Sequence, residues 1–332
     1  MAYLCTTEIK DAVEARYGNI WLDGMMGLIV GDALGCPVQF MERDEIRDRA
    51  QGPVTGMESG GVYDMPAGTW TDDSSMALAA LDSIRELGEV DLDDIMDSFV
   101  SWYEEGEYTP FGEAFDMGNT CSLAIEKYEQ ERDPMLCGGI SEHSNGNGSL
   151  MRIMPACLYA YAKGLSEEKA VKVVHEVSGL THNHLRSKIA CGLYYFCVRE
   201  ILDGTGTLAE RLQCGLDKGF AFYQKEIGYL TQLSYYGRLR DLAEFAAIPE
   251  NGIKSTGYVV DSLEAAIWSL LRTDSFMDCL LTAVNLGDDS DTIGAIAGGL
   301  AGLYYGYEAI PEEWLSVIQR KGWIEELCQG IR

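Results

Sequence analysis

The chain has 332 residues, of which 47% are hydrophobic, so it has enough apolar surface for a substantial core and is not globally disordered. Its formal charge of −28 at pH 7 argues against a protein that binds the phosphate backbone of nucleic acids, because such a protein needs a basic face. We expect most of the acidic residues to form a solvated surface, and we expect no nucleic-acid partner.

The first 20 residues contain acids and lack the apolar stretch of a signal peptide. The ten cysteines are spread from Cys5 to Cys328 without a CxxC pair or a Cys/His ligand spacing, which predicts buried, reduced thiols in a cytoplasmic protein. The apolar segment at residues 292–306 is too short and too rich in glycine to span a bilayer, so no membrane partner is expected.

Apolar residues recur at three- and fourfold spacing along most of the chain, which predicts helices, whereas alternating strand-like runs are scarce. Helix N-caps are predicted at Ser166 and at Asp274 or Ser275. No change in composition marks a linker, so we predict one all-α domain over residues 1–332. The predicted helices lie in residues 71–87, 91–105, 166–180, 184–202, 258–272 and 275–287, and the loops rich in Gly and Pro in residues 51–69, 106–120, 133–149 and 249–257.

Two segments more than two hundred residues apart share one construction, in which crowded acids and a hydroxyl residue precede a helix of small and apolar residues. In the second segment, Gly294, Gly298 and Gly302 are spaced four apart, which predicts a central helix packed closely against a neighbour. The polar residues are Thr71, Asp72 and Asp73 in the first motif and Asp288, Asp289, Asp291 and Thr292 in the second.

A single Asp at a helix N-terminus is an ordinary cap, but capping uses one carboxylate and does not account for two or three crowded together. Near a core such carboxylates are costly unless a positive charge neutralises them, and neither motif contains Lys or Arg. A hard divalent cation bound through oxygen is the natural counter-charge, with Thr71 or Thr292 as a hydroxyl ligand. Two interpretations stay open: one shared metal site, or separate helix caps with solvated acids.

Two other cation motifs fail on their spacing. An EF-hand loop that began at Asp289 would need an oxygen ligand where Ile293 stands. The run from Asp93 to Asp97 matches the DDxxD pattern of diphosphate-binding isoprenoid synthases, but the basic residues that should follow are absent. We therefore predict a solvated acidic helix face at residues 93–97.

Two further segments could contact a small ligand. Residues 144–155, SNGNGSLMRIMP, could form a nest of free N–H groups for a phosphate, or an ordinary turn before a helix. His182 and His184 have an HxH spacing, but no third zinc ligand follows nearby. A histidine beside a substrate pocket and a polar loop residue remain the two interpretations of His182.

These pieces, in this order, resemble the ADP-ribosylglycohydrolase family, which includes the dinitrogenase reductase-activating glycohydrolases and the ADP-ribosylarginine and ADP-ribosylserine hydrolases. The resemblance extends from about residue 20 to 320, and FDMGNTC and GYVVDSLEAAIW are most similar to the dinitrogenase reductase-activating branch. The other matching stretches are GLIVGDALGCPVQF, AGTWTDDSSMAL, GNGSLMRIMP, SGLTHNH and NLGDDSDTIGAIAGGLAGLYYG.

The resemblance implies a compact, mostly orthogonal all-α fold with two Mg²⁺ or Mn²⁺ ions in a central cleft. It implies hydrolysis of the bond between ADP-ribose and a modified protein side chain, with arginine as the expected linkage. Serine, O-acetyl-ADP-ribose and nucleobase linkages remain alternatives, as does a non-catalytic ADP-ribose sensor. The expected partners are ADP-ribose and an ADP-ribosylated protein. Separately from the resemblance, the sequence shows no exposed coiled-coil or strand-edge signal, so a monomer is expected.

The resemblance also assigns roles to individual residues. Tyr258 is expected at the scissile end, where it would stack on a guanidinium, and Asp288 matches no ligand position. The implied metal ligands are Thr71, Asp72, Asp73, Asp289, Asp291 and Thr292. The implied catalytic residues are Asp116, Asp73 and Asp291. The implied substrate-binding residues are Gly146, Asn147, Gly148, Ser149, Leu150, Met151, Arg152, His182 and Tyr258.

One departure from the family pattern bears on the linkage. Many members have Glu where this chain has Gln39, and Glu there can ligate metal or activate water in the serine-specific branch. Gln39 cannot act as a base, so arginine is favoured over serine, and Asp116 is the candidate for proton transfer.

Overall fold

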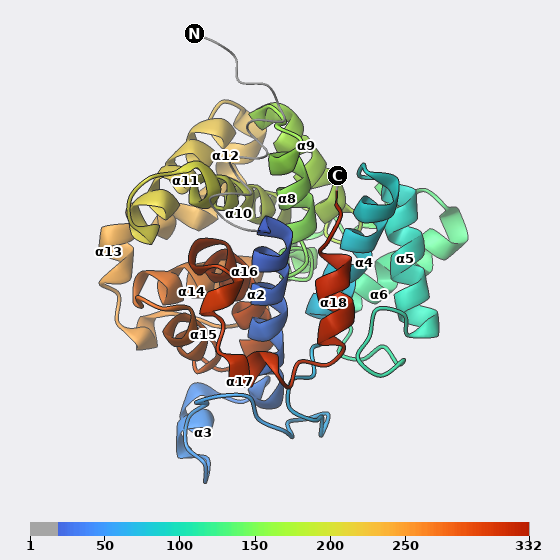
Figure 1. The fold of residues 1–332 in the computed structure, drawn as a ribbon. Helices are drawn as coiled ribbons and strands as arrows, with labels where there is room; N and C mark the ends of the chain where they lie inside the picture. The colour runs from blue at the N-terminus through green and yellow to red at the C-terminus, as the bar shows by residue number, and fades with distance from the viewer. Residues whose placement is uncertain (1–18, 332) are drawn as a thin grey trace.

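The computed structural model describes residues 19–331, and every regular element in that part of the chain is helical. The predicted all-α class is confirmed (Figure 1). The predictions for the N-terminal segment and for Cys5 fall almost entirely on residues outside the described range.

The α-helices of the described part are α2 (Ile20–Gly35), α3 (Arg43–Asp48), α4 (Asp72–Leu87), α5 (Leu92–Glu105), α6 (Asn119–Glu131), α7 (Pro134–Cys137), α8 (Met154–Ala162), α9 (Glu167–Gly179), α10 (Leu185–Asp203), α11 (Leu208–Tyr223), α12 (Ile227–Leu233), α13 (Leu242–Ala246), α14 (Val259–Leu271), α15 (Phe276–Val284), α16 (Ser290–Tyr305), α17 (Glu312–Leu315) and α18 (Lys321–Leu327). The 3-10 helices are η1 (Cys36–Val38), η2 (Glu142–Ser144), η3 (Ser234–Arg240), η4 (Glu250–Gly252) and η5 (Tyr307–Ala309).

All six segments predicted as helices form helices, namely α4, α5, α9, α10, α14 and α15. Ser166 caps α9 as predicted, and Ser275 rather than Asp274 caps α15, where its side chain accepts the Asp278 N–H. Helix α15 ends at Val284, three residues before the predicted end. It ends early because Gly287 has a φ of 78°, a left-handed conformation in which the chain turns towards the second acid motif.

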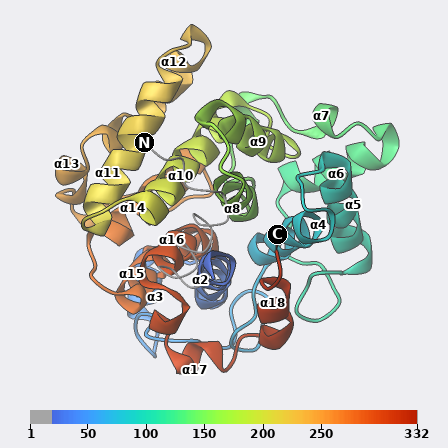
Figure 2. The same ribbon diagram turned by 45° about the horizontal axis from the view of Figure 1, so that its top comes forward.

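Helices α2 and α16 lie side by side in the middle of the molecule, as Figures 1 and 2 show. A Cβ atom on Gly27 would lie 2.2 Å from the carbonyl oxygen of Gly298, and one on Gly31 would lie 1.9 Å from that of Gly294. Only glycine permits such an approach, so the predicted closely packed central helix is confirmed. Because later positions of α2 meet earlier positions of α16, the two helices are antiparallel.

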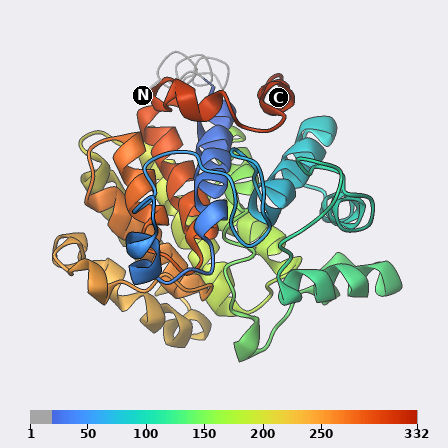
Figure 3. The same cartoon turned by 90° about the horizontal axis from the view of Figure 1, so that it is seen from below.

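The antiparallel pairing decides where the two acid motifs meet. Gly35, the last residue of α2, packs against the backbone of Asp291 in the first turn of α16. One turn earlier in α2, the side chain of Asp32 accepts the backbone N–H of Thr71, the N-cap of α4. The starts of α4 and α16 therefore lie at the same end of α2. In Figure 3 the blue loop between α2 and α4 crosses in front of the central helices.

One described segment, Ile20–Val38, is long and apolar enough to cross a membrane by length and composition alone. Within it, 94% of the apolar window is buried inside the protein, which is the environment of a core helix.

Two smaller predictions have clear outcomes. The nine described cysteines form no disulfide and all are buried except Cys214, which is exposed on α11 and contacts a Glu200 carboxylate oxygen. The expectation of buried thiols is therefore wrong for Cys214. On α5, Asp93 and Asp97 are exposed and Arg132 donates to Asp97, so the predicted acidic helix face is confirmed.

Candidate functional site

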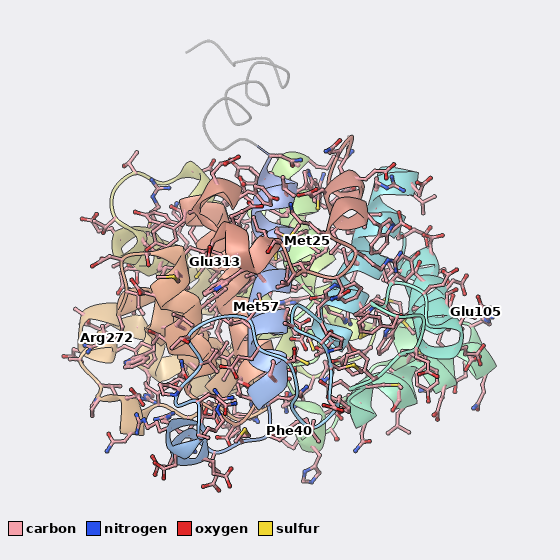
Figure 4. The ribbon with its side chains drawn as sticks, turned by 60° about the horizontal axis from the view of Figure 1, so that its bottom comes forward. Met25, Phe40, Met57, Glu105, Arg272 and Glu313 are labelled. Carbon is pink, nitrogen blue, oxygen red and sulfur yellow. The ribbon has the colours of Figure 1, made fainter. Side chains whose placement is uncertain are left out.

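Both acid motifs contribute to one open cavity of about 700 Å³, which we call the acidic cavity. Phe40, labelled in Figure 4, lies on its wall with 61% of its surface exposed. The predicted site residues that line the cavity are Asp72, Asp73, Asp116, Gly146, Asn147, Gly148, Met151, His182, Asp289, Asp291 and Thr292. Those that do not line it are Thr71, Ser149, Leu150, Arg152 and Tyr258.

A second cavity of about 640 Å³ lies beyond the second acid motif, and its wall carries Asp288. The Asp288 side chain is exposed and accepts a hydrogen bond from Ser255. Arg43 also lines this second cavity, but its guanidinium donates to the backbone carbonyls of Glu250, Ile253 and Leu286 and so holds these segments together. The chemistry-bearing groups are therefore gathered in the acidic cavity, and Asp288 lies outside it.

The two most buried carboxylates of the acidic cavity have unsatisfied oxygens. Asp73 is 1% exposed and Asp291 is 2% exposed, and the Oδ1 atom of each finds no hydrogen-bond partner in the described part of the chain. Asp73 Oδ2 lies 3.2 Å from Thr71 Oγ1 and 3.4 Å from Thr292 Oγ1, which come from opposite motifs. A buried carboxylate oxygen without a donor is costly, so these oxygens are suited to a cation.

The electrostatics agree with this reading. Burial raises the pKa values of Asp72, Asp73 and Asp291 well above that of an ordinary carboxyl, and neighbouring carboxylates raise them further. Burial also raises the pKa values of Asp289 and Asp116. Without a counter-charge these groups hold their protons to higher pH than an ordinary carboxyl group does, and a divalent cation would have the opposite effect.

Within residues 19–331, no three His, Cys, Asp or Glu side chains are already arranged around a common point as metal ligands. The donor set nevertheless fits a hard divalent cation. It offers carboxylate oxygens from the starts of α4 and α16, two of them unpartnered, together with the hydroxyls of Thr71 and Thr292.

The site contains a carboxylate to which the sequence assigned no role. Asp32 is fully buried in α2, and its two oxygens accept the backbone N–H of Thr71 at 3.0 and 2.9 Å. Its Oδ2 atom also accepts the N–H of Ser74 at 3.1 Å and the Ser74 hydroxyl at 2.6 Å. The available sequence signal was an acid inside the apolar run GLIVGDALG. Asp32 thus fixes the start of α4, and with it Asp72 and Asp73.

We expect Asp32→Asn to lower turnover by roughly 10- to 100-fold, the usual effect of losing a group that orients ligands. The amide can accept with one oxygen only, so its NH₂ group would face N–H donors of Thr71 or Ser74. Steady-state kinetics with a thermal melt checks this. Ser74→Ala, which removes a single hydroxyl donor, serves as the control and should cost less than tenfold. Equal activity of Asp32→Asn and wild type would contradict the assigned role.

Asp116 reaches the acidic cavity from the loop between α5 and α6, where it has a φ of 63°. Gln39 Nε2 donates to its Oδ2 at 2.7 Å, and the Tyr63 hydroxyl donates to its Oδ1 at 2.8 Å. Burial raises the pKa of Asp116, whereas these two hydrogen bonds lower it, with a raised pKa as the net result. The sequence alone treated Gln39 as a lost base and gave no role to Tyr63, but both hold Asp116 in place.

Four residues of the glycine loop, residues 146–152, line the cavity, namely Gly146, Asn147, Gly148 and Met151. Its Asn147 N–H donates to the Gly257 carbonyl, and its Asn147 side chain donates to Asp289 Oδ2, which ties the loop to the second acid motif. In the described part of the chain, the N–H groups of Gly148, Ser149 and Leu150 have no acceptor. Three successive free N–H groups form a site suited to an anion.

We expect Gly148→Ala to weaken ADP-ribose binding by roughly tenfold. A Cβ atom there would lie 2.9 Å from His182 Cε1 and 3.0 Å from Cys121 Sγ, so the loop would have to move. Calorimetric titration with ADP-ribose measures the effect. Gly228→Ala is the control, because Gly228 is exposed, does not line the cavity, and a Cβ on it meets nothing within 4 Å. Unchanged affinity in Gly148→Ala would show that the loop does not hold the ligand.

The remaining predicted residues are placed as follows. His182 is 2% exposed and lines the acidic cavity, whereas His184 caps α10 by accepting the Arg186 N–H. Arg152 is fully buried behind the glycine loop. Tyr258 pairs with Gly146 through its backbone, and its ring lies 5.8 Å from the Arg186 guanidinium carbon. The structure therefore places the Tyr258 ring beside Arg186 and off the cavity wall that carries Asp116.

Comparisons with known proteins agree with these features. The sequence model of the ADP-ribosylglycohydrolase family matches residues 15–332. The chain is 30% identical over 307 residues to the ADP-ribosylarginine hydrolase Tri1 of Serratia proteamaculans, with 92% of this chain and 77% of that protein covered. It is 33% identical over 300 residues to the ADP-ribosyl-[dinitrogen reductase] glycohydrolase of Rhodospirillum rubrum, with 90% of each chain covered.

The fold comparison gives the same answer. A solved structure described as an ADP-ribosylglycohydrolase-related protein complex superposes with a TM-score of 0.72 at 31% identity, covering 93% of this chain and 95% of that one. The chain therefore belongs to the ADP-ribosylglycohydrolase family, and it is an enzyme of that family.

Proposed function

We propose that this enzyme releases ADP-ribose from modified arginine side chains with the help of two divalent cations, Mg²⁺ or Mn²⁺. The observation that carries the proposal is the pair of unpartnered buried oxygens on Asp73 and Asp291, whose side chains line the same cavity as Gly148, the first of the three residues with free N–H groups in the glycine loop. The similarity to an ADP-ribosylarginine hydrolase supports arginine as the linkage.

Two sets of residues would hold the cations. One set is Thr71, Asp72 and Asp73 at the start of α4, and the other is Asp289, Asp291 and Thr292 at the start of α16. When bound, such cations hold ribose hydroxyls and lower the pKa of a bound water.

The chain's own residues supply the other functions. The N–H groups of the glycine loop bind the diphosphate, and His182 contacts a phosphate or the distal ribose from the same side. Asp116 acts at the leaving group. When the bond between the anomeric carbon and the guanidine nitrogen breaks, the nitrogen takes a proton from Asp116, and the oxygen of water bonds to the carbon. The proton that this water loses passes through the solvent to the Asp116 carboxylate and restores the acid. The raised pKa of Asp116 suits this acid role, and Gln39 and Tyr63 hold its carboxyl group in position.

We expect Asp116→Asn to slow cleavage by roughly 10²- to 10⁴-fold, the usual contribution of a general acid, while the affinity for ADP-ribose changes little. Single-turnover cleavage and calorimetric titration separate the two quantities. Glu113→Gln in the same loop is the matched control, because Glu113 is exposed and does not line the cavity. If Asp116→Asn cleaves at the wild-type rate, another group protonates the leaving nitrogen.

The proposal is tested by incubating metal-stripped protein with an ADP-ribosylated arginine peptide and, in parallel, a serine-linked one, with and without Mg²⁺ or Mn²⁺. Released ADP-ribose is followed by chromatography. We expect metal-dependent release from the arginine peptide. Release from the serine peptide alone would overturn the linkage that Gln39 favours. No release from either, with metal-dependent ADP-ribose binding, would identify another linkage or a sensor.

A further inference from the structure

Arg152 is a buried cation for which the described part of the chain provides no carboxylate partner. It has no exposed surface, and its Nε and Nη1 groups find no hydrogen-bond acceptor among the described residues. Its Cζ atom lies 4.6 Å from the centre of the Phe99 ring. Only Nη2 has hydrogen-bond partners, namely Thr181 Oγ1 at 2.8 Å and, at 3.4 Å, the Val177 carbonyl. A buried, unneutralised guanidinium is costly, which calls for a functional reason.

Thr181 links this cation to the acidic cavity. Its side chain is fully buried, and its Oγ1 atom lies 2.9 Å from His182 Nδ1. Arg152 can only donate, so it occupies a lone pair on Thr181 Oγ1 and leaves the hydroxyl proton free to be donated. If that proton is donated to Nδ1, the imidazole of His182 must carry its own proton on Nε2.

His182 Nε2 faces the anion-binding part of the cavity. It would lie 3.4 Å from a Cβ atom on Gly146, and His182 Cε1 would lie 2.9 Å from one on Gly148. Nε2 has no hydrogen-bond partner in the described part of the chain, although His182 is only 2% exposed. The ring is uncharged, since burial, with a smaller effect from the charge of Arg152, lowers the pKa of His182 to about 3. A neutral Nε2–H group beside free backbone N–H groups is a donor aimed at an anion.

We propose that Arg152 and Thr181 are positioning residues that hold His182 in its Nε2–H form, as a hydrogen-bond donor to the diphosphate of the ligand. Arg152 does not touch the ligand. Its hydrogen bond polarises the Thr181 hydroxyl towards Nδ1, and its uncompensated charge favours a negative ligand in the cavity. The identity of the ligand rests on the proposed function, but the form of the imidazole does not.

The first test is carried out on the ligand-free full chain labelled with ¹⁵N-histidine, with His182→Gln used to assign the signals. Long-range ¹H–¹⁵N spectra are expected to show a protonated Nε2 and an unprotonated Nδ1 for His182. Thr181→Ser should retain this pattern, and Thr181→Val should convert it to a mixture of both forms. A wild-type spectrum with the proton on Nδ1 would overturn the proposal, because the Thr181 hydroxyl would then turn to the nearby Cys121 thiol.

The second test is the affinity for ADP-ribose, measured by calorimetry. Thr181→Val should weaken binding by about tenfold, the effect of one hydrogen bond to a charged group, and Thr181→Ser should restore it to within about threefold. Thr109→Val is the matched control: this hydroxyl is also buried and hydrogen-bonded, but it lies outside the cavity, so its loss should leave affinity unchanged. Wild-type affinity and tautomer in a folded Thr181→Val protein would contradict the proposal. If wild-type protein binds no ADP-ribose, the proposed function fails, and the spectra still decide the form of His182.

Discussion

Asp73→Asn and Asp291→Asn are each expected to reduce turnover by roughly a thousandfold or more. Each removes a carboxylate whose Oδ1 atom has no other partner in the described structure and is suited to a cation. Cation binding contributes several kcal/mol of transition-state stabilisation, and about 4 kcal/mol corresponds to a thousandfold change in rate. Release of ADP-ribose from a modified arginine peptide at saturating Mg²⁺ or Mn²⁺ measures the effect.

The second acid motif provides a control beside the target. Asp288 precedes Asp289 directly but is exposed, lies on the other cavity and has a φ of 54°. Asn tolerates that backbone conformation, so Asp288→Asn should fold normally and retain turnover to within a few fold. If Asp288→Asn loses as much activity as Asp291→Asn, the general negative charge of the motif matters rather than a specific ligand. If all three variants remain active, the two motifs do not form the site.

The second large effect concerns stability. The metal-free protein is expected to lose stability as the pH rises from about 5 to 8, and a divalent cation should reverse the loss. Burial raises the pKa of Asp32 to about 7 and those of Asp72, Asp73 and Asp291 well above the ordinary value near 4. At pH values between the ordinary pKa of the unfolded state and the raised pKa of the folded state, the folded protein binds more protons than the unfolded protein. The free energy of unfolding therefore falls as the pH rises through this window.

Differential scanning calorimetry of metal-stripped protein between pH 5 and 8 checks the direction. A cation that binds only the folded state, at a concentration of about a hundred times its Kd, adds about 2.7 kcal/mol to the free energy of unfolding. This raises the melting temperature by several degrees. The increase should be larger at pH 8 than at pH 5, because protons compete with the cation for the carboxylates. Asp73→Asn should show a shallower pH dependence and a smaller response to the cation. A melting temperature that rises between pH 5 and 8 and does not change when Mg²⁺ or Mn²⁺ is added would contradict a buried carboxylate cluster.

Local patterns in the sequence were sufficient to predict much of the fold and part of the site. The threefold and fourfold periodicity predicted α4, α5, α9, α10, α14 and α15, because burial of one helix face fixes that spacing. The glycines of residues 294–302 predicted the close central helix pair. The shared construction of the two acid motifs raised a common site as one of two interpretations, and the antiparallel pairing of α2 and α16 brings both motifs to one cavity.

The residues that support the site could not be predicted in the same way. Asp32 contacts Thr71 across 39 positions of sequence, and Gln39 contacts Asp116 across 77 positions. Contacts of this kind depend on how the helices pack in three dimensions, and they produce no repeating spacing in the sequence from which they could be predicted. Arg152 was predicted as part of a loop that binds the ligand through backbone N–H groups, a prediction that does not place its side chain. That side chain is buried, does not line the cavity and contacts Thr181. A loop's backbone direction can be inferred from its glycines, whereas the side on which each side chain lies depends on the surrounding helices.

The most direct test of the account is a crystal structure of the protein soaked with Mn²⁺ and ADP-ribose, with anomalous scattering used to locate the metal. We expect anomalous peaks in the acidic cavity within coordination distance of carboxylate oxygens from both motifs, including Asp73 and Asp291, and the diphosphate against the N–H groups of the glycine loop. Anomalous density confined to the exposed Asp288, or absent while ADP-ribose is bound, would contradict the conclusion that the two acid motifs form one metal site.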